Sequence, residues 1–353
     1  MNKQKILIYI LIIVLIGLAG AFIWFKFYPK KVVAQTPSTT SETPPTKTEV
    51  KSEVVVPDNS IEEDLNVTGD EYNGQDTSKE RQDIEKLYSD IATITQDIDY
   101  QNVQGEDMKF DLFIPLDKYK NELDKNGYPL VIYVHGGGWV GGDKTVFDQV
   151  GGLVRLIKAG YAVASINYHL APDYNYPVQL ADVEQAIVFL RHESEKYKLN
   201  TSRIGLMASS AGGQIAAQYV SLNTNPNTKV DALALVAPAT DLYSDTWSHG
   251  MKQYIKKLLN GKSTASAASP INNISNNLPP IYIVQGEKDT TVKPAQTQAY
   301  VDKLKAAGKI VELLMVTGAG HDFNSATPIE PSKADIGKTI VRFMNQYVRL
   351  VNS

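Results

Sequence analysis

Six short apolar runs, separated by stretches with helical spacing, constrain the fold of this chain more than any other feature. Each run is almost wholly apolar, as a strand must be when helices cover both faces of its sheet. The runs span residues 130–134, 162–166, 204–207, 232–236, 281–284 and 311–316. Their alternation with helical patterns predicts an α/β fold with a mostly parallel central sheet covered by helices on both faces.

Three consecutive glycines follow the first run, in residues 135–139 (His-Gly-Gly-Gly-Trp). A catalytic oxyanion hole needs backbone N–H groups aimed at one point, and side chains there would obstruct a substrate. An ordinary Gly-rich turn between a strand and a helix is the alternative. The glycines alone do not decide between these interpretations, but a second motif favours the catalytic one.

That motif is the turn at residues 208–213 (Ala-Ser-Ser-Ala-Gly-Gly), which lies between the third apolar run and a helical pattern. A nucleophile elbow holds its serine on a strained turn, with small residues two positions before and two after it. Counted from Ser210, these positions hold Ala208 and Gly212. Counted from the preceding serine, one of them holds Met207, which is much harder to fit. Ser210 is therefore the candidate nucleophile.

A serine hydroxyl needs a neighbouring base, usually a histidine that a carboxylate orients. Of the five histidines in the chain, His321 comes late and directly after the last apolar run. This position beyond a strand end favours a catalytic base. A solvent-exposed loop histidine is the alternative.

Three loop acids are candidates for the orienting carboxylate: Glu287, Asp289 and Asp322. Glu287 is closer to the preceding apolar run, and Asp322 adjoins the histidine but would have to fold back on it. Asp289 lies in the loop where the carboxylate is needed, and the chain order serine, aspartate, histidine is that of α/β-hydrolases. Order and context together select Asp289, with solvated loop acids as the ordinary alternative for all three.

With these motifs, residues 100–350 resemble the hormone-sensitive-lipase-like branch of the α/β-hydrolases, and within it the small bacterial esterases related to acetyl-xylan and feruloyl esterases. The matching stretches are residues 135–143, 167–172 (Asn-Tyr-His-Leu-Ala-Pro), 208–213 and the loops of Asp289 and His321. The resemblance implies an α/β-hydrolase fold.

The resemblance also implies an oxyanion hole formed by the backbone amides of Gly137, Gly138 and Ala211. It makes residues 167–172 and 177–182 structural supports beside the site. The family pattern has glycine where this chain has Ala208 and often an acid where it has Ser209. We expect an altered turn geometry without loss of activity.

Composition excludes several other classes of protein. The formal net charge is −4 and no basic stripe appears, so nucleic-acid binding is not expected. The chain has neither a His-Glu-x-x-His spacing nor a Gly-rich phosphate loop ending in Lys-Ser or Lys-Thr, and we expect no metal and no cofactor. Because the chain has no cysteine, it has neither a disulfide nor a lipoprotein anchor.

Residues 6–25 carry no charge and are long enough, as a helix, to cross a bilayer core of about 30 Å. A cleavable signal peptide is the alternative, since residues 19–21 resemble a cleavage site. The apolar run continues beyond them, which favours an uncleaved anchor. Residues 36–53 are rich in Thr, Ser, Pro, Glu and Lys and predict a disordered tether. The predicted organisation is a short segment at 1–5, an anchor at 6–25, a polar linker at 26–76 and a catalytic domain at 77–353.

Two segments are candidates for a cap over the site. A capping box at residues 77–80 and apolar residues at helical spacing up to Ile98 predict a helix that packs on the hydrolase body or covers the site. The insertion at residues 243–268 has a helical pattern from 251 to 259. Because it is short, we expect a relatively open site, which Trp139 and Trp247 would line unless they pack in the core.

The sequence therefore predicts a single-pass membrane-anchored enzyme that hydrolyses carboxylic esters through an acyl-enzyme. The substrate would be a small-molecule or glycan-linked ester, with short acyl chains of about two to four carbons. An amide or peptide hydrolase is one alternative, since the triad does not discriminate. A catalytically silent surface-binding domain is another, motivated by Ala208. The sequence does not indicate an oligomeric state.

The predicted topology rests on the linker, because lysines flank the apolar segment almost equally on both sides. A long polar stalk would hold an enzyme away from the envelope toward external polymers. We therefore expect the catalytic domain outside the cytoplasm. Secretion after signal cleavage is the alternative localisation.

Overall fold

The computed structural model describes residues 86–103, 106–121, 124–145, 149–261 and 263–349. The chain divides into two units, Met1–Glu62 and Glu63–Ser353, and all described residues belong to the second. The expected anchor at 6–25, the linker at 26–76 and the capping box at 77–80 lie outside the described residues. Within the described ranges, no helix combines the length and the apolar character needed to span a membrane.

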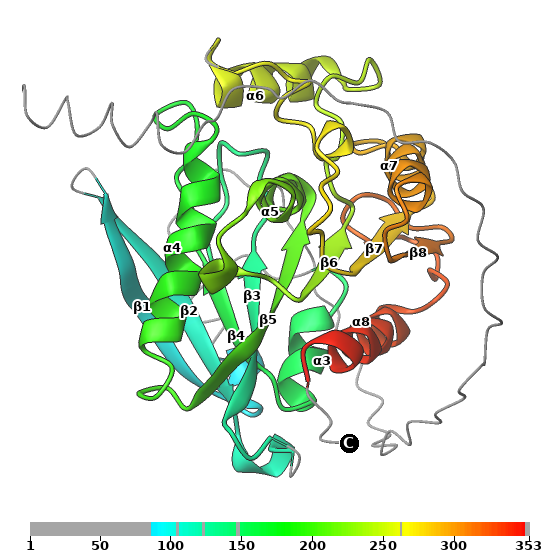
Figure 1. Cartoon of the computed structure of the whole chain (residues 1–353). Coiled ribbons are helices and arrows are strands. Elements are labelled where there is room, and N and C mark those ends of the chain that lie inside the picture. Colours follow the sequence, from blue (N-terminus) through cyan, green and yellow to red (C-terminus); the bar gives the residue numbers. More distant parts are fainter. Residues whose placement is uncertain (1–85, 104–105, 122–123, 146–148, 262, 350–353) are drawn as a thin grey trace, which may run out of the picture. The chain divides into compact units, whose positions relative to one another are not determined.

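A single eight-stranded sheet has the order β1-β2-β4-β3-β5-β6-β7-β8 (Figure 1). Six strands are parallel and coincide with the six apolar runs: β3 (Tyr128–Val134), β4 (Ala162–Ile166), β5 (Leu199–Ser209), β6 (Ala232–Val236), β7 (Ile281–Gly286) and β8 (Val311–Val316). At one edge, β1 (Ala92–Val103) and β2 (Glu106–Pro115) form an antiparallel hairpin, and β2 also runs antiparallel to β4. The mostly parallel sheet expected from the sequence is confirmed.

Helices cover both faces of the sheet because alternate residues of each strand point to opposite sides. In β3, Leu130 and Ile132 belong to a buried cluster that includes residues of α4 (Val178–His192), α5 (Ser210–Leu222) and α7 (Pro294–Ala306). On the other face, Val131 and Tyr133 belong to a second buried cluster, which includes residues of α3 (Gly152–Lys158) and α8 (Lys333–Tyr347). Short 3-10 helices at Asp117–Tyr119, Pro226–Thr228 and Pro270–Asn272 complete the connections.

The prediction of a helix that continues to residue 98 is wrong from residue 89 onward, because residues 89–91 form a turn and β1 begins at Ala92. Ile94 and Ile98 lie in β1, where they face Phe113 and Phe110 of β2. The residues around them are mainly threonine and isoleucine, whose branched side chains favour a strand. The helical spacing misled because the strand depends on pairing with β2, which the sequence analysis did not identify.

The insertion between β6 and β7 contains α6 (His249–Leu259), in agreement with the helical pattern of the sequence. In Figure 1, α6 lies beyond the carboxyl ends of the parallel strands.

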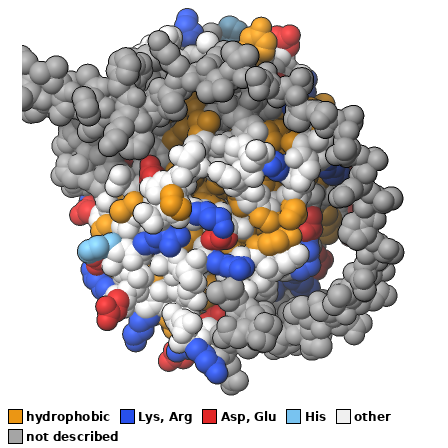
Figure 2. All heavy atoms as spheres, viewed as in Figure 1, with side chains coloured by type: hydrophobic (Ala, Val, Ile, Leu, Met, Phe, Trp, Pro, Cys, Tyr) orange, Lys and Arg blue, Asp and Glu red, His pale blue; other side chains and the backbone are white. Residues whose placement is uncertain are grey.

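Figure 2 shows lysine and arginine side chains interspersed with acidic and uncharged ones on the visible face. The loops that carry the candidate catalytic residues follow β3, β5, β7 and β8, so the parallel strands deliver them to one edge of the sheet.

Candidate active site

Ser210, His321 and Asp289 form a hydrogen-bonded row at this edge of the sheet. His321 Nε2 lies 2.9 Å from Ser210 Oγ, and His321 Nδ1 lies 2.8 Å from Asp289 Oδ2. Ser210 begins α5, Asp289 follows β7 and His321 follows β8. The structure thus brings together the three side chains selected from the sequence, from positions 111 and 32 residues apart.

The turn at Ser210 has the geometry of a nucleophile elbow. Its φ is 51°, in the left-handed region, at the point where β5 ends and α5 begins. A Cβ on Gly212 would overlap the backbone oxygens of Val134 and His135. Ala208 is fully buried and pairs with Val134 of β3. The core therefore accommodates the extra methyl group at position 208 and leaves Ser210 in the strained conformation.

The surroundings of Asp289 orient its carboxylate toward the histidine. Asp289 is buried, and its Oδ1 accepts hydrogen bonds from the amides of Thr291 and Val292, both at 2.8 Å. Its Oδ2 accepts one from Gln285 Nε2 at 2.9 Å and also faces His321. Gln285 was not singled out in the sequence, since a buried strand glutamine carries no motif signal. These bonds fix which oxygen reaches the imidazole.

The rival acids make other contacts. Glu287 is exposed and accepts a hydrogen bond from the amide of Gly318. Asp322 Oδ1 accepts one from the amide of Asn324. Neither carboxylate is placed against the His321 ring, so Asp289 alone of the three candidates occupies the orienting position.

The glycine loop lies against the serine turn. A Cβ on Gly136 would lie 3.3 Å from Ser210 Cβ, which is closer than ordinary packing allows. Gly137 and Gly138 have φ values of 119° and 60°, which favour glycine. Considering only the described part of the chain, their amides donate to no backbone or side-chain acceptor. Like the amide of Ala211 in the first turn of α5, they remain available to a ligand.

Residues 167–172 contact this loop, and residues 177–182 contact residues 167–172 in turn. The Tyr168 hydroxyl donates to the carbonyl of His135 at 3.2 Å. Asp182 accepts hydrogen bonds from the backbone and ring of His169, at 2.9 and 2.8 Å. Gln179 Nε2 donates to the carbonyl of His169 at 2.9 Å. These contacts join the second segment to the first and the first to the glycine loop.

The two tryptophans proposed as lining residues pack in the core instead. Trp139 is fully buried and donates its Nε1–H to Gln214 Oε1 at 2.9 Å. Trp247 is 4% exposed and donates to the carbonyl of Asp241 at 2.8 Å. Their satisfied N–H groups suit burial more than substrate contact.

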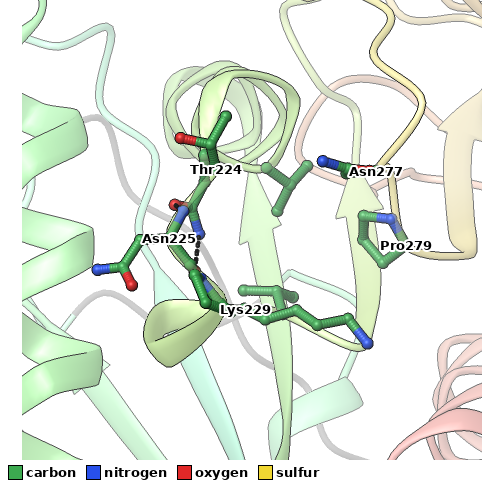
Figure 3. A pocket seen from close by; sticks show the side chains of 9 residues that line it. Thr224, Asn225, Lys229, Asn277 and Pro279 are labelled. Carbon is green, nitrogen blue, oxygen red and sulfur yellow. Dashed lines mark hydrogen bonds between the residues drawn. The ribbon is translucent and has the colours of Figure 1, made fainter. Parts of the chain in front are cut away.

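A separate cavity of about 260 Å³ lies at the C-terminal end of α5 (Figure 3). It shares no residue with the serine, histidine and aspartate row, and its lining consists of Val220, Asn223, Thr224, Asn225, Pro226, Lys229, Val230, Asn277 and Pro279. The residues that the structure describes include no group of histidine and acidic side chains placed to hold a metal ion.

His135 ties the stability of the glycine loop to pH. Its ring is buried and stacks on Tyr168, and burial lowers its pKa from 6.5 to about 4. The unfolded chain therefore binds a proton that the folded state excludes between these two pH values. Above about pH 6.5 the histidine is neutral in both states and does not reduce the free energy of unfolding. As the pH drops to about 4, proton uptake by the unfolded chain lowers the free energy of unfolding by up to about 3 kcal/mol.

We predict that His135→Gln reduces the loss of unfolding free energy between pH 7.5 and pH 4.5. Urea unfolding of both proteins at the two pH values measures the difference. An identical pH dependence in wild type and variant would contradict the buried neutral histidine.

Comparison with known proteins supports the family and the fold. The BD-FAE family model matches residues 116–304. Esterase LipC of Mycobacterium tuberculosis is 27% identical over 225 residues, which are 58% of this chain and 55% of LipC. Carboxylesterase NlhH of the same species is 27% identical over 241 residues, which are 63% of this chain and 75% of NlhH. The chain thus spans about half the length of LipC.

A solved structure, a truncated carbohydrate esterase from gut microbiota, has a TM-score of 0.58 and 22% identity, and covers 71% of this chain and 96% of its own. At this identity it supports the α/β-hydrolase fold alone. The resemblance to the hormone-sensitive-lipase-like α/β-hydrolases is confirmed by these relatives. Because the family match covers more than half of the 353 residues, the chain belongs to the BD-FAE family.

Proposed function

We propose that this chain hydrolyses carboxylic esters through an acyl-enzyme. The observation that carries the proposal is the row of Ser210, His321 and Asp289 beside a glycine loop with two available amides. A serine hydroxyl within hydrogen-bond reach of a histidine that a buried carboxylate orients is the arrangement for nucleophilic attack on a carbonyl. The names of the relatives LipC and NlhH, an esterase and a carboxylesterase, support the same reaction.

In the first half-reaction, Ser210 Oγ bonds to the ester carbonyl carbon while His321 Nε2 takes the hydroxyl proton. Asp289 accepts a hydrogen bond from Nδ1–H and stabilises the imidazolium that forms. The carbonyl electrons move onto oxygen, and the amides of Gly137, Gly138 and Ala211 stabilise that oxyanion. As the tetrahedral intermediate collapses, His321 gives the proton to the leaving alcohol. Water then repeats the sequence on the acyl-enzyme and releases the acid.

We predict that Ser210→Ala and His321→Ala each lower kcat for p-nitrophenyl acetate by about a thousandfold or more, since such residues act as a unit. Asp289→Asn should lower it less. Ser209→Ala should be mild, because Ser209 Oγ lies 2.9 Å from the Tyr133 hydroxyl and outside the row. Glu287→Gln and Asp322→Asn are matched controls for the acid and should retain activity. Loss of activity in Ser209→Ala with retention in Ser210→Ala would reverse the assignment.

Assays of the wild-type protein with different substrates separate the alternatives. Parallel assays with aminoacyl anilides distinguish an amide hydrolase from an esterase. Absence of turnover with every ester and anilide in wild type would favour a silent binding domain.

We further propose a preference for short acyl groups. A Cβ on Gly138 would lie 2.8 Å from the ring of Tyr254 on α6, so this ring occupies the space directly beside the glycine loop. Tyr254 is 39% exposed and can therefore contact a substrate. Its bulk would limit the room beside the oxyanion for a long chain.

We predict that wild type favours acetyl over octanoyl p-nitrophenyl esters and that Tyr254→Ala raises the octanoyl-to-acetyl ratio of kcat/KM by about tenfold. Tyr254→Phe keeps the ring and should keep the wild-type ratio. A wild-type kcat/KM that climbs steadily with chain length would contradict the proposal.

For localisation, we propose that residues 6–25 anchor the protein in the membrane and that the linker holds the catalytic domain outside the cytoplasm. Protease added to intact cells or spheroplasts should cut between residues 36 and 76 and release an active fragment that begins near residue 77. Protection until the membrane is permeabilised would reverse the orientation. A mature N-terminus just after residue 21 would show secretion instead of anchoring.

A further inference from the structure

A buried lysine lies at the end of the glycine loop, between two carboxylates. Lys144 Nζ lies 3.0 Å from Asp111 Oδ1 and 3.1 Å from Asp97 Oδ1. The lysine side chain is 2% exposed and the Asp111 side chain is 0% exposed. Both acids come from the β1–β2 hairpin, which precedes the part of the chain matched by the family model.

The hairpin is shaped to present these acids. Asp97 lies in a β-bulge between Thr95 and Ile98 and has a φ of 56°. Bulges re-aim side chains at defined positions of a strand. The amide of Asp97 donates to Asp111 Oδ1 at 2.8 Å, while Asp111 Oδ2 has no hydrogen-bond partner among the described residues. Lys144 is therefore the cation that Asp111 depends on.

Burial disfavours the charged forms of Asp111 and Lys144. Burial raises the pKa of Asp111, although the amide of Asp97 and the charge of Lys144 oppose it. Burial alone would lower the pKa of Lys144, but the neighbouring carboxylates outweigh it and leave that pKa raised. Well-packed apolar residues often stabilise a fold as well as a buried ion pair does. Stability alone therefore does not explain the cluster, and we consider a role in positioning.

Lys144 is linked to the glycine loop through hydrogen bonds of its own backbone and through the close packing of the glycines that precede it. Its amide donates to Asn167 Oδ1 at 2.5 Å, and its carbonyl accepts from Ser165 Oγ at 2.6 Å. Two residues earlier, Gly142 packs so closely on His135 that a Cβ would overlap the ring and the carbonyl of residue 136.

The next residue back continues this contact. The amide of Gly141 donates to the carbonyl of Gly137 at 3.1 Å. A Cβ on Gly137 would overlap the carbonyl of Gly141. We therefore expect a shift at Lys144 to reach the amides of residues 137 and 138 through these close contacts.

We propose that Lys144, held by Asp111 and Asp97, is a positioning residue that fixes the amides of Gly137 and Gly138 where the oxyanion forms. The proposal deepens the ester hydrolase function, and its kinetic readout rests on that function. The hairpin then contributes to catalysis without touching the substrate. Misplaced amide donors destabilise the transition state more than the bound substrate. We therefore expect kcat to fall while KM remains unchanged.

The test compares Asp111→Asn, which removes one charge without changing shape, with Lys144→Arg, which keeps the positive charge, and Lys144→Met, which removes it. Asp111→Asn and Lys144→Met should lower kcat for p-nitrophenyl acetate by at least about tenfold per folded molecule, with KM within about threefold. Lys144→Arg should retain most of kcat. Binding of a trifluoromethyl ketone, which forms an oxyanion on the serine, should weaken by the same factor as kcat.

Asp124→Asn is the matched control. Arg349 Nη2 lies 3.0 Å from Asp124 Oδ2, and the two side chains are 5% and 6% exposed. This pair is therefore buried like that of Lys144 and Asp111, but it joins the chain just after α8 to the loop before β3. Asp124→Asn should lower the thermal midpoint and leave kcat per folded molecule unchanged. If Asp111→Asn behaves in the same way, its pair is only structural and the proposal is wrong.

Hydrogen exchange gives a readout that does not need activity. Exchange of a peptide covering residues 135–144 should become several-fold faster in Asp111→Asn and stay at the wild-type rate in Asp124→Asn. Unchanged exchange overturns the proposal, and so does faster exchange with unchanged kcat in an active enzyme. If wild type hydrolyses no ester, the proposed function fails, and exchange alone then decides whether the cluster holds the loop.

Discussion

The left-handed backbone of Ser210, between the end of β5 and the first turn of α5, is the constraint on which the rest of the site depends. A non-glycine residue at a φ of 51° costs on the order of 1–3 kcal/mol, so packing around it must hold it there. Ala208 is buried in the sheet before it, and Gly212 lies against the end of β3 after it, where a side chain would not fit. This packing directs the hydroxyl toward His321 and leaves the amide of Ala211 at the open end of a helix.

The other parts of the site depend on the same edge of the sheet. Asp289 and His321 follow neighbouring parallel strands, and the glycine loop follows the strand next to β5. Buried donors hold the Asp289 carboxylate, while the loop closes on itself through Gly137 and Gly141. Groups that are fixed before substrate binds need little reorganisation during the reaction, which is the main source of electrostatic catalysis. Under the proposed function, the fold supplies both the nucleophile and a rigid place for the developing charge.

The parts of this arrangement that are local in the chain could be predicted from the sequence. The six parallel strands are short apolar runs, and Ser210 is distinguished from Ser209 by the size of the residues two positions away. The carboxylate was harder, because Glu287, Asp289 and Asp322 all lie in suitable loops. Burial and the two amide donors single out Asp289 in the structure.

Features that depend on contacts between distant segments could not be predicted in this way. The β1–β2 hairpin forms by mutual pairing, and the spacing of Ile94 and Ile98 was equally compatible with a helix. The ion pair between Lys144 and Asp111 joins residues 33 positions apart without a motif. The placement of Tyr254 against Gly138 depends on how α6 lies over the loop. Such contacts become visible only when the chain is folded.

Covalent labelling tests the central claim, a nucleophilic Ser210 activated by His321, most directly. Wild-type protein would be treated with a fluorophosphonate, digested and mapped by mass spectrometry, beside His321→Ala. The account predicts one phosphonyl group per molecule, on the Ser210 side chain, and much slower labelling of the variant. Labelling at Ser209, or equal labelling rates in wild type and His321→Ala, would contradict it.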